Sequence, residues 1–208
     1  MRIHNNDRFD MIAEHFVATP DLLRLFAAIH PDASWEHAIT LMQALQEKGF
    51  DAPKSEDDDF PGDPTEAPEL TQVWGHDNED GAMAYFARGR TGTIAIASLA
   101  WTLGVNLSSL HAVEAVKQAL VDLSQTLGPA NAVLDQTASW VKDGGAGSGD
   151  EMAASACWSR EAIAASGPAH GANDYLAAKR KLVSPIEFSV VLEQNSTKKW
   201  NVIGSLSF

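Results

Sequence analysis

The chain has 208 residues, of which 45% are hydrophobic and 21% are charged, and its formal net charge is -13. This length suits one domain with a substantial core, and the composition excludes a wholly disordered chain. The single cysteine, Cys157, excludes an internal disulfide framework, and the acidic balance disfavours binding to a nucleic-acid backbone, which requires basic residues.

Two helices are expected near the start of the chain. Thr19 is a suitable cap for a helix that has Pro20 in its first turn and ends before Pro31. A second helix begins near residues 32–34 and continues to the next glycine, with apolar residues at helical spacing. Residues 9–49 would therefore form an N-terminal helical hairpin.

The acidity of the chain is concentrated in residues 51–80. Of the 28 acids and 15 bases in the chain, eleven acids and one base, Lys54, fall in this segment, which leaves 17 acids and 14 bases elsewhere. Its first part, residues 51–71, also contains four prolines and lacks regular apolar spacing. This pattern predicts a long acidic loop.

A hairpin is expected in the middle of the chain, where residues 83–87 and 93–99 alternate around a glycine-rich turn. The many alanines would also allow two short helices capped by Asp80 and Thr93. A second alternating pair, at 186–192 and 200–208, favours strands for both because a lone hairpin is only marginally stable.

Between the two hairpins the sequence predicts helices. A strong apolar stripe marks residues 110–127, and further helices are expected at about 131–142, 150–167 and 174–181, with a glycine-rich linker at 144–149. The predicted fold class is therefore α+β, mainly helical, with a small antiparallel sheet formed by a central and a C-terminal hairpin. We expect a single domain over residues 1–208, with its α+β core at 81–208.

No local motif indicates a catalytic or metal site. His111 and Glu114 stand three apart and would supply two metal ligands at most. His76 begins a stretch that resembles a calcium loop but lacks the acid required at its end. Cys157 lies among alanines, as a small buried residue would, and Ser148 lacks the Gly-x-Ser-x-Gly context. We predict no metal and no cofactor.

Arg88 and Arg90 lie on the tip of the central hairpin. Two guanidinium groups there would suit a carboxylate or phosphate, since each presents a planar fork of donors. The simpler interpretation is a solvated tip, or pairing with the acidic loop just upstream.

The first ten residues lack the apolar run of a signal peptide, and no apolar stretch approaches the roughly 20 residues of a spanning helix. We therefore expect a soluble, cytoplasmic protein that does not contact membranes.

The charge segregation favours a non-catalytic interaction protein that binds a basic protein partner, as immunity proteins and secretion chaperones do. The alternative is a small-molecule enzyme or ligand-binding domain with a pocket lined by His and Arg residues, so the question of enzymatic activity stays open. A third interpretation is that the acidic loop only solubilises the protein. The predicted partner-binding residues are nine acids and two aromatic anchors: Glu56, Asp57, Asp58, Asp59, Phe60, Asp63, Glu66, Trp74, Asp77, Glu79 and Asp80.

Overall fold

The computed structural model describes residues 19–30, 33–50, 54–55, 70–77, 82–89, 91–144, 152–160, 169 and 171–208. For 54–55 and 70–77 it describes the backbone only.

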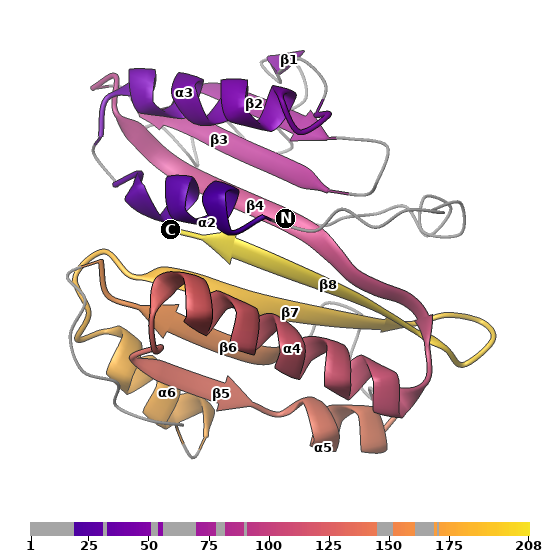
Figure 1. Cartoon of the computed structure of the whole chain (residues 1–208). Coiled ribbons are helices and arrows are strands. Elements are labelled where there is room, and N and C mark those ends of the chain that lie inside the picture. Colours follow the sequence, from indigo (N-terminus) through magenta and orange to yellow (C-terminus); the bar gives the residue numbers. More distant parts are fainter. Residues whose placement is uncertain are drawn as a thin grey trace.

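An antiparallel sheet forms the centre of the fold (Figure 1). Within the described residues it has eight strands in the spatial order β1-β2-β3-β4-β8-β7-β6-β5. Each half is a meander of strands that are neighbours in sequence, and the antiparallel pair of β4 and β8 joins the two halves. The strands are β1 (Lys54–Ser55), β2 (Leu70–Asp77), β3 (Met83–Gly89), β4 (Ile94–Leu107), β5 (Ala132–Asp135), β6 (Met152–Trp158), β7 (Ile186–Gln194) and β8 (Trp200–Ser207).

The prediction of an α+β fold is confirmed, but the prediction that it is mainly helical with a small sheet is wrong. Both expected hairpins are present, as β3–β4 and β7–β8, and they are the central strands of a much larger sheet. The predicted acidic loop over 51–71 is also interrupted, because β1 lies within it and β2 begins at Leu70.

Two segments that were expected to be helices contain strands. Residues 132–135 form β5, and only α5 (Thr137–Lys142) is helical in the segment predicted at 131–142. The alanine-rich segment after residue 150 contains β6, where Ala153, Ala154 and Ala156 are at most 1% exposed. Their small side chains let helices pack closely on the sheet, so tertiary packing overrides the helical preference of alanine.

Four helices cover one face of the sheet, which we call the helix-covered face (Figure 1). They are α2 (Pro20–Ala28), α3 (Trp35–Gln46), α4 (Ser109–Leu127) and α5. The helices predicted near the N-terminus and at 110–127 are thus confirmed. The Thr19 and Ser108 side chains cap α2 and α4 by accepting from backbone amides at 3.4 and 3.3 Å, as expected for N-cap residues.

The register of the sheet separates its two faces. Ala84, Leu99, Leu206, Phe188 and Ala156 are cross-strand partners in one row from β3 to β6, and each is at most 1% exposed. Directly paired residues share a face, so this row is the centre of the core beneath the helices.

The next row belongs to the opposite face, because successive residues of a strand alternate. It runs through Tyr85, Ser98, Ser207, Glu187 and Cys157 and is much more polar. Helix α6 (Ala172–Lys179), which confirms the helix predicted near 174–181, packs beside β5 and reaches this row.

Candidate functional site

The acidic segment is attached to the edge of the sheet formed by β1 and β2. Lys54 and Ser55 of β1 pair with Gly75 and Trp74 of β2, and the other side of β2 pairs with β3. Residues 56–69 connect to the start of β2 and residues 78–81 connect to its end. Most of the acids of this segment therefore lie in the two stretches that precede and follow β2 in the sequence.

Most of the predicted partner-binding residues lie outside the described residues, so their role stays a prediction. Two lie on β2, where Trp74 is the cross-strand partner of Phe86 and Asp77 is the cross-strand partner of Met83. The residues outside the described part are Glu56, Asp57, Asp58, Asp59, Phe60, Asp63, Glu66, Glu79 and Asp80.

The turn between β3 and β4 confirms the predicted hairpin but places Arg88 against its own turn. The Gly89 amide donates to the Thr93 carbonyl at 2.9 Å, and Gly92 has a positive φ of 79°. The Arg88 Nη2 atom lies 3.4 Å from the position that a Cβ on Gly92 would occupy. Arg90 lies outside the described residues, so the predicted anion site of two arginines stays a prediction.

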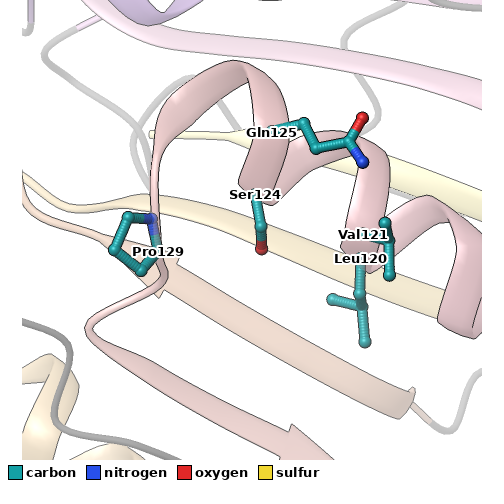
Figure 2. Close-up of a pocket in the computed structure, with 5 residues that line it drawn as sticks. All are labelled: Leu120, Val121, Ser124, Gln125 and Pro129. Carbon is teal, nitrogen blue, oxygen red and sulfur yellow. The ribbon is translucent and has the colours of Figure 1, made fainter.

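A pocket of about 420 Å³ lies along one side of α4 (Figure 2). Leu120, Val121, Ser124 and Gln125 line it from the helix, and Pro129 lines it from the segment that follows. None of these five side chains ionises near neutral pH, and the exposed His111 at the start of the same helix is not among them. This pocket suits an apolar contact and lacks the groups for proton transfer.

A cluster of ionisable groups lies between α6 and the sheet. The Tyr175 hydroxyl donates to Glu187 Oε1 at 3.2 Å, and Lys179 Nζ forms an ion pair with Glu187 Oε2. Tyr175 and Lys179 share a face of α6 because they are four residues apart, and Glu187 is the cross-strand partner of Cys157. Helix periodicity and strand register together assemble the cluster.

This cluster is closed to solvent at its centre. Cys157 is fully buried and Tyr175 is 2% exposed. Burial raises the pKa of the Cys157 thiol, and burial, with the neighbouring Cys157 and Glu187, raises the pKa of the Tyr175 hydroxyl. A neutral, buried thiol is a poor nucleophile, so the structure agrees with the prediction that Cys157 is a small buried residue.

The raised pKa of Tyr175 predicts a loss of stability at alkaline pH. An unfolded tyrosine releases its proton near pH 10.0, whereas the folded protein retains it. The stabilisation is complete well below pH 10 and falls as the pH rises through and above it, with a slope that approaches about 1.4 kcal/mol per pH unit. We expect the difference in unfolding free energy between the wild type and Tyr175→Phe to shrink by about 1 kcal/mol between pH 10 and 11.

Urea unfolding of both proteins at pH 8, 10 and 11 would measure this difference. Other titrating groups are shared by the two proteins and largely cancel in the comparison. A constant difference across this range would show that Tyr175 ionises normally in the folded state.

Arg160, which follows β6, has a partly satisfied guanidinium group. Its Nη1 donates to the Ala27 carbonyl at the end of α2 at 2.7 Å, and its Cζ lies 4.6 Å from the centroid of the Phe208 ring. Its Nε and Nη2 atoms are buried and have no hydrogen-bond partner within the part of the chain that the structure describes. Burial also lowers the pKa of Arg160 to about 10.

Comparisons of the chain with protein-family models, curated proteins and solved structures found no match. The function must therefore be argued from the geometry and charge of the chain itself.

The described residues contain no group of three side chains from His, Cys, Asp and Glu that is arranged to hold a metal ion. In the same part of the chain, no helix is both long enough and apolar enough to cross a membrane.

Sequence reasoning did not identify Arg160 or the cluster around Glu187. The Tyr175–Lys179 spacing and the outward position of Glu187 between Ile186 and Phe188 were signals for the cluster. These signals identify the cluster only when the pairing of β6 with β7 is known. The alanines of β6 predicted a helix, so this pairing was not expected. No sequence signal distinguished Arg160 from the other arginines.

Proposed function

We propose that this chain is a non-catalytic protein-binding protein that engages a basic partner through the acids of residues 51–80. The observation that carries the proposal is charge segregation, since eleven of the 28 acids and only one of the 15 bases lie in these 30 positions. Carboxylates at this density repel one another, and a cationic partner would offset that repulsion. Such a surface also accelerates association with a basic protein.

The place of this segment in the fold supports the proposal. Its residues are attached to both ends of β2 at one edge of the sheet, whereas the described core is centred on β4, β7 and β8. Changes to the acids are therefore separable from changes to that core, which makes the proposal testable by substitution.

The other described sites give further support. The pocket on α4 has no ionisable lining residue, and the thiol and hydroxyl of the cluster beneath α6 are buried. The pocket therefore lacks an acid or base for proton transfer, and the partly exposed Lys179 and Glu187 of the cluster are paired with each other.

The test compares two variants with the same net charge. Asp57→Asn, Asp58→Asn and Asp59→Asn remove three acids from the segment, whereas Glu36→Gln, Glu47→Gln and Glu114→Gln remove three exposed acids from the helical side. Each protein is immobilised on a support and incubated with cell lysate at about 50 mM and at about 300 mM salt. Screening weakens charge pairing over this range of salt concentration. Retained proteins are then identified by mass spectrometry.

We expect the wild type and the Glu36/Glu47/Glu114 variant to retain the same basic protein at low salt and to release it at high salt. The Asp57/Asp58/Asp59 variant should bind it at least about tenfold more weakly, equivalent to about 1.4 kcal/mol. Equal retention by the two variants, or a partner whose binding is insensitive to salt, would contradict the proposal.

A further inference from the structure

The two unpartnered donors of Arg160 lie on the same edge of its guanidinium group. Nε and Nη2 are both buried and make no hydrogen bond to the described residues, while Nη1 on the other side donates to the Ala27 carbonyl. The N–H bonds of Nε and Nη2 are parallel, so they form a fork that can donate to both oxygens of a carboxylate. Buried donors without an acceptor are rare in folded proteins because they lose their hydration without compensation.

This fork is held in a fixed orientation. The Ala27 carbonyl binds one side of the group, the Phe208 ring lies against its face, and the Phe26 ring is 5.8 Å from the Phe208 ring. The site thus lies where the ends of α2, β6 and β8 meet. Among the described residues, ion pairs join Arg24 to Asp21 and Lys179 to Glu187, and neither includes Arg160.

We propose that Arg160 binds an organic carboxylate through its Nε and Nη2 atoms. A planar carboxylate matches both donors, and its single negative charge balances the single charge of the guanidinium. The Phe208 ring beside the guanidinium suits an apolar or aromatic group attached to that carboxylate. A phosphate would bring more negative charge than the guanidinium balances, and it would have a third oxygen for which this fork has no donor.

The carboxylate reaches the fork by local opening, because Nε and Nη2 have almost no contact with solvent. It is either a small free acid or the chain-terminal carboxylate of another protein, and the chemistry at Arg160 is the same for both. This site is independent of the proposed function, since it involves a cation on a different part of the sheet from the acidic segment.

The experiment measures the midpoint of thermal unfolding with increasing benzoate, and with benzamide as a neutral molecule of the same shape. It uses the wild type, Arg160→Met and, as a matched control, Arg24→Met, which removes an exposed arginine of α2. Benzoate near saturation should raise the midpoint of the wild type and of Arg24→Met by about 3 °C or more. It should leave Arg160→Met unchanged, and benzamide should shift none of them.

A second measurement does not depend on the folding of the variant. In the wild type, the NMR resonance of the Arg160 Nε–H group should shift on addition of benzoate. Two results would overturn the proposal. One is an Arg160 Nε–H resonance that stays unchanged at the highest benzoate concentration of the thermal experiment. The other is a thermal shift in Arg160→Met that equals the shift in the wild type. A larger shift with inorganic phosphate than with benzoate would also overturn it.

Two short peptides distinguish the sources of the carboxylate. One ends in phenylalanine with a free carboxylate, and the other is its C-terminal amide. Tighter binding of the free peptide than of benzoate would support a chain terminus as the ligand, and tighter binding of benzoate would support a small acid. Binding of the amide as strongly as the free peptide would overturn the role of the carboxylate.

Discussion

Replacing Trp200 with alanine should lower the free energy of unfolding by about 3–5 kcal/mol, the largest effect that we expect from a single substitution. Trp200 is 1% exposed, and its ring centroid is 4.9 Å from that of Trp140 on α5. Its indole nitrogen also donates to Ser109 Oγ at the start of α4, at 3.3 Å. The side chain therefore joins β8 to two helices of the helix-covered face.

Trp200→Phe and Ile39→Ala are the controls for this prediction. The phenylalanine retains much of the packing but loses the hydrogen bond, so its cost should be roughly half as large. Ile39 is 42% exposed, and truncating it should cost less than about 1 kcal/mol. Urea unfolding would measure all three variants. A loss below about 1 kcal/mol for Trp200→Ala would show that Trp200 does not hold the helices in place.

Gly204→Ala should destabilise the protein by about 1–3 kcal/mol, although it adds only one methyl group. A Cβ at this position would lie 2.9 Å from Cε2 of Phe188 and 3.3 Å from Cδ1 of Leu103. Phe188 is fully buried and also packs against Trp101, with ring centroids 5.9 Å apart, so its ring has little freedom to move. The new methyl group would therefore strain the centre of the core.

Gly171→Ala provides the matched control. Gly171 has an extended φ of -179°, and a Cβ there would meet no atom within 4 Å, so the cost should be less than about 1 kcal/mol. The double variant Gly204→Ala/Phe188→Leu should lose less unfolding free energy than the sum of the losses in the two single variants, because the smaller leucine leaves room for the methyl group. Fully additive costs in urea unfolding would show that the clash is absent.

The sequence was most informative where local rules agree with the fold. Caps at Thr19 and near Ser108, and the alternation of apolar residues in β7 and β8, predicted elements that the structure contains. In these segments the pattern of side chains reflects local geometry and one buried face, and neither depends on distant parts of the chain.

The sequence failed where packing decides the structure. The alanines of β6 have a helical preference, but they are buried beneath α4 and α5, which tertiary packing places on this strand. The cluster of Tyr175 and Glu187 and the fork of Arg160 depend on strand register and on the meeting of distant segments. Local patterns contain no information on such contacts, whereas the charge segregation in 51–80 is visible without any fold.

The pairing of β4 with β8 has a consequence for how the protein folds during synthesis. Ser98 pairs with Ser207, so the contact that joins the two meanders spans about half of the chain. Such long-range contacts slow folding, because a large loop must close before the pairing stabilises it. Until β8 has left the ribosome, β4 and β7 each present an unpaired edge that is able to pair with other chains. The protein should therefore depend on chaperones during translation more than its modest size suggests.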